Sequence, residues 1–409
     1  MLRPRPGRHL PSELQAGEVG CLAGALPQGV RDAGFETLLS RIAEKPFHSG
    51  NRVQLFFLGE DAFASMLEAV ASARSEVLLE SYILKDDPTG RLFQEALVAA
   101  RRRGVAVRVL ADGFGSWHTR SSFWRELRSN GIKARLFHPP WPGVRYLPFR
   151  DHRKIIVVDR RVAFTGGMNI ADEYGSSRLP RGVLWRDTHA RVEGPAAWEM
   201  AVVFREGWRQ AGEPSFGIDD LIPVASSGAQ ILVLDSRPGR GAAEYAAALA
   251  AVVGAARTRL WLTTAYFAPR RRALTILGEA VRRGVDVRLL LPGRSDVPIL
   301  RHAGHGFFSS LLRRGVRVFE YQPAMLHAKT AVADGYVSVV GSSNLDFRSF
   351  ELNAECNFAI LDAATGQRME AQFEEDLASA VEIRPAPWRR RPWLHRSTDS
   401  LARRLAPVL

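Results

Sequence analysis

Residues 152–169 read HRKIIVVDRRVAFTGGMN, and residues 327–344 read HAKTAVADGYVSVVGSSN. Both stretches begin with His-x-Lys, have Asp seven residues after the His, and end in a turn of small residues before an Asn. Four polar residues of the first stretch recur 175 positions later, giving the pairs His152/His327, Lys154/Lys329, Asp159/Asp334 and Asn169/Asn344. A single His-x-Lys arises easily by chance, but two copies that share four polar positions indicate an internal duplication.

Each copy contains an apolar run, at residues 155–158 and 330–333, that predicts a buried β-strand. Residues two apart on a strand face the same side, so each His projects with the Lys that follows it. A neutral imidazole can act as a nucleophile, and a lysine ammonium neutralises a phosphoryl oxygen. The turn offers backbone N–H groups and an Asn amide to an anionic oxygen. Two units supply one imidazole to attack phosphorus and one to protonate the leaving oxygen, which predicts a phosphodiester site that needs neither metal nor cofactor.

The paired motifs resemble the HKD signature of the phospholipase D superfamily. The flanking sequence is similar to one branch of it, the bacterial cardiolipin synthases without a transmembrane anchor. The matching segments are SGNRV (49–53), ESYIL (80–84), ADGFGS (111–116), GGMNIADEY (166–174), WRDTH (185–189) and GSSNLDFRSFELNAE (341–355). Together they cover most of residues 49–380.

Strand and helix patterns alternate in the same order in both parts of the chain, which predicts an α/β fold. The segment ARRRGVAVRVL at 100–110, for example, recurs as AVRRGVDVRLL at 280–290. The resemblance implies two homologous α-β-α sandwich halves of the phospholipase D fold, related by a pseudo-twofold axis, with one active site at their interface. The expected divisions are an N-terminal lead-in at 1–48, a first half at 49–213, a second half at 214–383 and a basic amphipathic tail at 384–409.

The resemblance also implies distinct roles for the two histidines. His152 is expected to be the nucleophile that forms a phosphatidyl-histidine, and His327 the general acid and then the general base; the near-symmetry of the halves leaves the reverse assignment open. The predicted phosphate-binding residues are Lys154, Lys329, Asn169, Asn344, Gly167 and Ser342. For each Asn, a plain turn-forming role is the alternative.

The two turns differ, because Ser342 stands where the first copy has Gly167. A serine hydroxyl can hold the leaving or the incoming alcohol, so the two faces of the phosphate need not be equivalent. A neutral exchange in a tolerant turn is the alternative.

Four acidic residues accompany the histidines. Asp159 and Asp334 complete the motif and belong to the candidate catalytic set, but they lie at the far end of a strand that rises about 3.3 Å per residue. A structural role, holding the next turn or pairing with a basic residue, is therefore favoured for both. Asp187 and Glu355 resemble the family's acids behind the histidines, where a carboxylate fixes the imidazole tautomer. For these two, a surface salt bridge is the alternative.

Composition sets looser bounds. The chain has 409 residues, a formal net charge of +13 and a pI near 10.4, which favours an anionic partner, although an Arg-rich proteome would give the same figures. Cys21 and Cys356 match no metal or redox spacing, which fits a reducing compartment. The basic N-terminus lacks the apolar stretch of a signal peptide, and no apolar run approaches the roughly 18 residues that span a bilayer. We therefore expect a soluble or peripheral protein.

Two basic, aromatic segments favour lipid over nucleic acid as the anionic partner. Residues 139–150 interleave Trp141, Tyr146 and Phe149 with arginines. Residues 388–409 place leucines at roughly helical spacing opposite arginines, after two tryptophans, which is typical of an interfacial helix on an anionic bilayer. Such segments also bind single-stranded nucleic acid, and a tail helix can dock on its own domain.

The resemblance implies cardiolipin synthesis, in which a phosphatidyl group passes from phosphatidylglycerol to the head group of a second phospholipid and glycerol is released. Water as acceptor would make the protein a phospholipase D, and DNA as substrate would make it a metal-independent nuclease. A membrane-binding scaffold with an inactive site is disfavoured, because the polar positions are intact in both copies. The expected partners are anionic phospholipids, phosphatidylglycerol and cardiolipin, with no nucleic acid. The expected location is the cytoplasmic face of a bacterial cell membrane.

Overall fold

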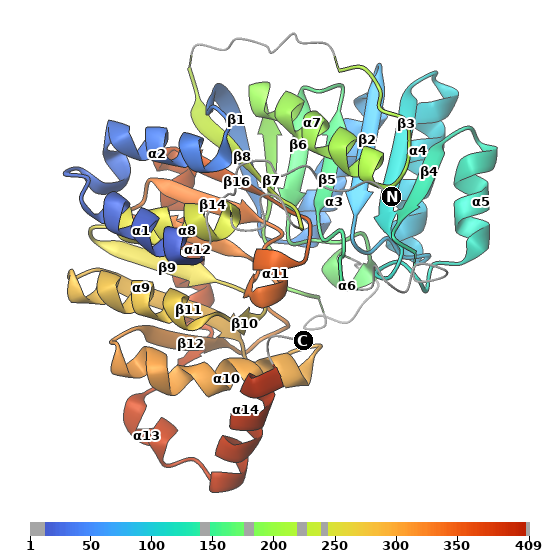
Figure 1. Cartoon of the computed structure of the whole chain (residues 1–409). Coiled ribbons are helices and arrows are strands. Elements are labelled where there is room, and N and C mark those ends of the chain that lie inside the picture. Colours follow the sequence, from blue (N-terminus) through green and yellow to red (C-terminus); the bar gives the residue numbers. More distant parts are fainter. Residues whose placement is uncertain (1–12, 140–147, 176–183, 219–226, 239–243, 406–409) are drawn as a thin grey trace, which may run out of the picture.

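The computed structural model describes residues 13–139, 148–175, 184–218, 227–238 and 244–405. Within them a 15-stranded sheet crosses the molecule, with helices on both faces (Figure 1). Its first half has the order β1 (His48–Phe56), β7 (His189–Glu193), β6 (Val162–Gly166), β5 (Lys154–Val158), β2 (Glu76–Ser81), β3 (Ala106–Asp112) and β4 (Lys133–Phe137). Its second half has the order β8 (Ala229–Ser236), β16 (Glu355–Leu361), β14 (Val337–Gly341), β13 (Thr330–Ala333), β9 (Arg259–Thr263), β11 (Asp286–Pro292), β12 (Arg317–Tyr321) and β17 (Ala380–Glu382).

The two strand orders mirror each other around the β1–β8 pair, where Asn51 pairs antiparallel with Ala229. β5 and β13 follow the two His-x-Lys motifs and occupy equivalent places, each between an antiparallel hairpin partner and β2 or β9. Nearly every side chain on these two strands is buried, as their apolar runs predict. The predicted α/β fold with two homologous halves is confirmed.

Helices cover the sheet in two layers. On one face lie α3 (Gly59–Ser72), α4 (Pro88–Arg102) and α5 (Ser121–Ser129) of the first half, and α8 (Glu244–Ala255), α9 (Arg271–Arg282) and α10 (Pro298–Arg313) of the second. On the other face, α7 (Pro195–Gln210) and α12 (Ala363–Ala378) pack into one core cluster with strands of both halves. This shared core holds the halves together and so fixes the interface between them. The domain boundaries at 48, 213 and 383 stay predictions.

The predicted lead-in contains two helices, α1 (Glu13–Gly24) and α2 (Ala33–Ala43), that pack against α8. α8 is rich in Ala and Val and is buried on nearly all sides, because α1 and α2 cover the side that points away from the sheet. Small residues allow this close approach. A Cβ added to Gly254 would lie 2.2 Å from the carbonyl oxygen of Gly20.

The tail forms α13 (Pro385–Arg389) and α14 (Trp393–Leu405), and α14 packs across α10. Its buried residues are Asp399 and Ala402, and the Asp399 carboxylate lies 2.9 Å from His302 and 2.8 Å from Arg391. The exposed large apolar residues of α14 are Trp393, Leu394, Leu401 and Leu405. Among the described helices, none is long and apolar enough to cross a bilayer. Trp141, Tyr146 and residues 406–409 lie outside the described residues.

The small elements at the site complete the fold. β10 (Phe267–Ala268) pairs with β15 (Leu345–Asp346), and the short helices α6 (Asp172–Gly175) and α11 (Phe347–Glu351) follow the two Asn-containing turns. The segments 169–175 and 344–351 therefore occupy matching positions after the motifs.

Candidate active site

Both histidines lie just before strands, β5 and β13, at the interface of the two halves. The His152 N–H donates to the carbonyl oxygen of Ala354 (2.9 Å), and the His327 N–H donates to that of Arg186 (2.7 Å). Ala354 and Arg186 each belong to the opposite half, and each directly precedes a predicted acid. The same backbone contact thus ties each histidine to the acid-bearing segment of the other half.

The two acids contact the imidazoles across this interface. Glu355 Oε2 lies 3.0 Å from Nδ1 of His152, and Asp187 Oδ2 lies 2.7 Å from Nδ1 of His327. Both carboxylates are fully buried. An acid at Nδ1 fixes the tautomer and the orientation of the ring and leaves Nε2 for chemistry. Among the described residues, neither Nε2 atom makes a hydrogen bond.

The surroundings keep both carboxylates ionised. Burial alone would raise the pKa of Glu355, but the charge and hydrogen bond of His152 and the charge of Lys154 bring this pKa below its usual value. Against the same effect of burial, His327 and Lys329 lower the pKa of Asp187. Two ionised acceptors therefore face the Nδ1 atoms at neutral pH.

The lysines of the motifs lie beside the histidines and are almost fully buried. Lys154 Nζ donates to the carbonyl oxygen of His152 (2.6 Å), and Lys329 Nζ lies 2.9 Å from Nδ1 of His327. Burial lowers the pKa of Lys154 to about 7 and that of Lys329 to about 8, although the acids Glu355 and Asp187 oppose the shift. Both ammonium groups are therefore desolvated and ready to exchange internal partners for an anionic oxygen.

The imidazoles are neutral at neutral pH. Burial lowers the pKa of His327 to about 4, and the charge of Lys329 adds to this effect, while Asp187 opposes it. Burial also lowers the pKa of His152, with Glu355 opposing and Lys154 adding to the shift. A neutral imidazole is the form that can attack phosphorus.

Aromatic rings surround the imidazoles at centroid distances of 5.0 to 6.1 Å. They are Tyr82 beside His152, and Tyr174, Trp185 and Tyr266 beside His327. These rings exclude water from the histidines, which is why burial dominates the histidine pKa values. No role is assigned to these rings from the sequence. Tyr does recur at equivalent positions of the two halves, 82 and 266, and this recurrence is the feature that could have identified them.

The two motif asparagines turn their side-chain oxygens to the backbone, Asn169 to the Ile83 N–H (3.1 Å) and Asn344 to the Tyr266 N–H (3.3 Å). The amide nitrogen of Asn169 also donates to the hydroxyl of Tyr174 (2.8 Å). The side-chain amide nitrogen of Asn344 makes no hydrogen bond within the described residues, whereas its backbone N–H donates to the Ser349 hydroxyl (3.0 Å). Asn344 thus keeps a donor for an anionic oxygen, and contact of either Asn with phosphate stays a prediction.

Gly167 and Ser342 lie behind the histidines, against the acids. A Cβ on Gly167 would stand 2.1 Å from Oδ1 of Asp187, so this carboxylate occupies the space that a side chain would need. The Ser342 hydroxyl donates to Glu355 and accepts the Cys356 N–H (3.0 Å). The N–H groups of Gly167 and Ser342 donate to backbone carbonyls. This hydrogen bonding favours a role in positioning the acids over the predicted contact with substrate.

Asp159 and Asp334 lie at the far ends of β5 and β13, away from the histidines, in hairpin turns with φ values of 50° and 51°. Asp tolerates this left-handed conformation better than most residues. The Asp159 carboxylate accepts the backbone N–H groups of Arg74, Ser75 and Glu76 at 2.7 to 2.9 Å. The Asp334 carboxylate accepts those of Arg257, Thr258 and Arg259 at 2.8 to 2.9 Å. Each aspartate thereby fastens its hairpin to the turn before β2 or β9.

Arg153, between His152 and Lys154, is a residue that the motif comparison misses. Its guanidinium is fully buried, 2.8 Å from Asp235 and 3.2 Å from Glu80. Asp235 lies on β8, so this ion cluster crosses the interface between the halves. The second motif has Ala328 at the equivalent position. The available signal is a charged residue inside a buried segment, because a buried charge must be paired.

Comparisons with known proteins agree with this architecture. A family model described as "Cardiolipin synthase, PLD-like domain" matches residues 66–192 and 249–377. Cardiolipin synthase 1 of Bacillus cereus is 30% identical over 396 residues, spanning 94% of this chain and 78% of that protein. Cardiolipin synthase of Halalkalibacterium halodurans is 33% identical over 379 residues, spanning 91% and 75%.

Solved structures share the fold. Phosphatidylserine synthase of Haemophilus influenzae superposes with a TM-score of 0.70 at 11% identity, covering 92% of this chain and 100% of that one. Polyphosphate kinase of Porphyromonas gingivalis gives a TM-score of 0.54 at 16% identity, covering 85% and 50%.

Proposed function

This chain belongs to the cardiolipin synthase family of proteins with phospholipase D-like domains, and on that premise we propose that it transfers a phosphatidyl group between two phosphatidylglycerol molecules, giving cardiolipin and glycerol. The observation that carries the proposal is the pair of histidine–carboxylate contacts that cross the interface. They present two oriented imidazoles to one phosphodiester, which is the requirement for a two-step transfer through an enzyme-bound intermediate.

In the first step, Nε2 of His152 attacks the phosphorus of the donor lipid. The bond from phosphorus to the glycerol oxygen breaks, and His327 gives that oxygen a proton, so glycerol leaves. The negative phosphodiester raises the pKa of the nearby imidazoles on binding, which supplies the protonated His327 that this step needs. The product is a phosphatidyl group on His152.

In the second step, neutral His327 takes the proton from a hydroxyl of the second phosphatidylglycerol. The oxygen attacks phosphorus, the bond from phosphorus to Nε2 of His152 breaks, and cardiolipin leaves. Both histidines return to their starting protonation states. Because the proton donor of the first step is the base of the second, one residue serves both.

The remaining residues divide into phosphate ligands and supports. We assign phosphate binding to Lys154 and Lys329, which can exchange their internal partners for the phosphoryl oxygens, and to the free amide donor of Asn344. We assign positioning of the histidines to Asp187 and Glu355. Gly167 and Ser342 support the two acids, and Asp159 and Asp334 hold the hairpins that follow the motifs.

We propose that the protein acts as a peripheral protein on the cytoplasmic face of the membrane. The net charge of +13 favours a surface of anionic lipid. α14 docks through the face that carries Asp399 and Ala402 and leaves large apolar side chains exposed, among them Trp393 (74%) and Leu401 (62%). An amphipathic helix oriented in this way is suited to the interface of a bilayer.

The test is to incubate the full chain with phosphatidylglycerol liposomes and a chelator and to resolve the lipids by mass. We expect cardiolipin and free glycerol from the wild type and neither from His152→Ala. Phosphatidic acid alone would make water the acceptor and the protein a hydrolase. Absence of lipid turnover, together with salt-sensitive cleavage of DNA, would replace the proposal with a nuclease.

A further inference from the structure

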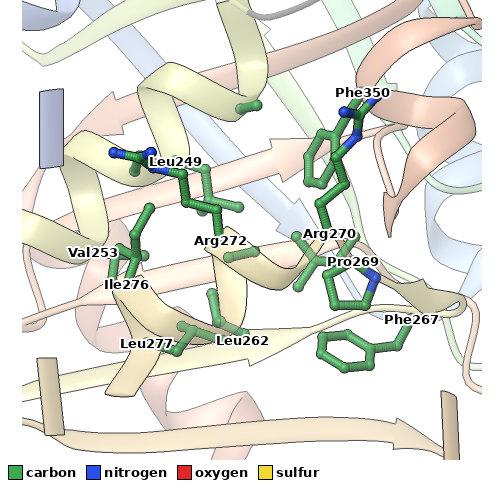
Figure 2. A pocket seen from close by; sticks show the side chains of 14 residues that line it. Leu249, Val253, Leu262, Phe267, Pro269, Arg270, Arg272, Ile276, Leu277 and Phe350 are labelled. Atoms are coloured by element: carbon green, nitrogen blue, oxygen red, sulfur yellow. The ribbon is translucent and has the colours of Figure 1, made fainter. Parts of the chain in front are cut away.

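An apolar cavity of about 80 Å³ lies between α8 and α9 in the second half (Figure 2). α8 contributes Leu249 and Val253, α9 contributes Ile276 and Leu277, and the floor is formed by Leu262 and Phe267. Such a lining offers no hydrogen bonds to a polar guest, so the cavity suits a hydrocarbon.

The equivalent helices of the first half can be aligned by a repeated hydrogen bond. Arg103 Nη2 donates to the carbonyl oxygen of Val70 (3.0 Å), and Arg283 Nη2 donates to that of Val253 (2.8 Å). α3 therefore corresponds to α8 with an offset of 183 residues, and α4 corresponds to α9 with an offset of 180.

On this alignment, Phe63 corresponds to Ala246, and Phe93 corresponds to Ala273. The two phenylalanine rings are buried and meet edge to face with centroids 5.5 Å apart, so they fill the space between α3 and α4. The two alanines line the cavity between α8 and α9. The cavity thus results from two exchanges of a ring for a methyl group within a duplicated framework.

The rim of the cavity is basic. Figure 2 shows the guanidinium ends of Arg270 and Arg272 away from the floor that Leu262 and Phe267 form. Arg270 pairs with Glu351, whereas Arg272 makes no ion pair or hydrogen bond with any described residue. A cation at the mouth of an apolar cavity complements an anionic amphiphile.

Two residues that line the cavity directly follow active-site residues in the sequence. Phe267 follows Tyr266, whose ring is 6.1 Å from that of His327, and Leu345 follows Asn344. Tyr266 and Asn344 lie just before the short strands β10 and β15, so at both places the chain passes directly from the active site into the wall of the cavity. The cavity is therefore on the side of the proposed general base.

We infer that the cavity holds part of one acyl chain of the acceptor phosphatidylglycerol, with Arg272 contacting the acceptor's phosphate. The inference rests on the proposed function, because the acceptor is the second substrate of that reaction. The donor's phosphate is bound at the histidines, so the acceptor's unreactive phosphate needs a cation elsewhere. The second half supplies that cation and an apolar site. The first half has Leu92 at the position of Arg272, and the rings of Phe63 and Phe93 fill the space that corresponds to the cavity.

The double variant Ala246→Phe/Ala273→Phe tests this inference by giving the second half the rings that the first half already accommodates. We expect glycerol release from phosphatidylglycerol liposomes to stay near the wild-type rate, while the ratio of cardiolipin to phosphatidic acid falls at least about tenfold. Each excluded methylene weakens acceptor binding roughly fourfold, and water then captures the intermediate. Thr275→Phe, which adds a ring at an exposed position of α9 outside the cavity, is the matched control.

If the double variant fails to fold, a second variant, Arg272→Leu, tests the inference in its place. We expect the same change in product ratio, by about tenfold, with glycerol release retained. An unchanged ratio in an active enzyme would overturn the inference and leave the proposed function intact. Loss of glycerol release at an unchanged ratio would place the donor in the cavity and also overturn the inference. A wild type that makes no cardiolipin would overturn both.

Discussion

His152 takes its acid from the other half of the molecule, because Glu355 Oε2 lies 3.0 Å from its Nδ1 atom across the interface. The reciprocal contact joins His327 to Asp187 at 2.7 Å. Neither half therefore contains a complete histidine–carboxylate pair, and docking of the halves is required to orient either imidazole. Because both pairs form only where the two halves meet, the molecule has a single candidate active site at that interface.

Glu355→Gln and Asp187→Asn are each expected to lower kcat by about 10²–10⁴-fold, because an amide no longer fixes the histidine tautomer. Thermal unfolding should show that both variants remain folded. The exposed Glu95→Gln serves as control. Wild-type rates for either site variant would exclude the positioning role of that acid.

The order of the histidines can be tested with a phosphatidyl ester of p-nitrophenol, whose leaving group needs no proton. His327→Ala should release one equivalent of p-nitrophenol and accumulate a phosphatidyl-enzyme, because it lacks the base for the second step. His152→Ala should release none. Mass spectrometry of the quenched protein locates the adduct, and an adduct on His327 in the His152→Ala variant would reverse the assignment.

The pH profile of kcat/KM should fall on the alkaline side as the lysines lose their protons. Lysine is charged below its pKa, and the values of about 7 for Lys154 and about 8 for Lys329 place this loss between roughly pH 6 and 9. On the acid side, activity should fall as the nucleophilic imidazole becomes protonated. Lys154→Arg should move the alkaline limb upward, because Lys154 has the lower of the two pKa values and guanidinium stays charged; a limb that does not move would assign it to another group.

Asp159→Ala and Asp334→Ala are expected to lower stability and to spare the chemistry. Each change leaves backbone N–H groups without their acceptor, at a cost of about 1–3 kcal/mol in the free energy of unfolding. Urea denaturation measures this loss, with Glu95→Ala as control. Below the unfolding transition, kcat should remain within a few-fold of wild type, and a thousandfold loss of kcat in a folded variant would contradict the structural role.

Leu394→Ser/Leu401→Ser should weaken binding to anionic liposomes by roughly tenfold or more, because both side chains are exposed and apolar on α14. Sedimentation with vesicles measures the binding, and the exposed Ser400→Ala controls for changes to the helix. Turnover of a detergent-solubilised substrate should not change. Unaltered vesicle binding would remove α14 from the proposed membrane surface.

The amino-acid sequence alone was sufficient for the α/β class, the duplication and the candidate groups His152, Lys154, His327 and Lys329. These features are local, because strand periodicity and motif spacing depend on neighbours within a few residues. Asp159 and Asp334 belong to the same motif, and the length of the strand between them and the histidines already predicted that they lie too far away to contact the same phosphate. The structure adds what they hold, which is the turn before β2 or β9.

Only the tertiary structure decided which acid serves which histidine, since the contacts join residues 203 and 140 positions apart. It likewise placed the Ser342 hydroxyl on Glu355, paired Arg153 with Asp235 of the other half, and opened the cavity beside Ala246. Each of these depends on how the two homologous halves dock and on where their side chains differ in volume. Sequence periodicity is the same in both halves and carries no information about the contacts between them.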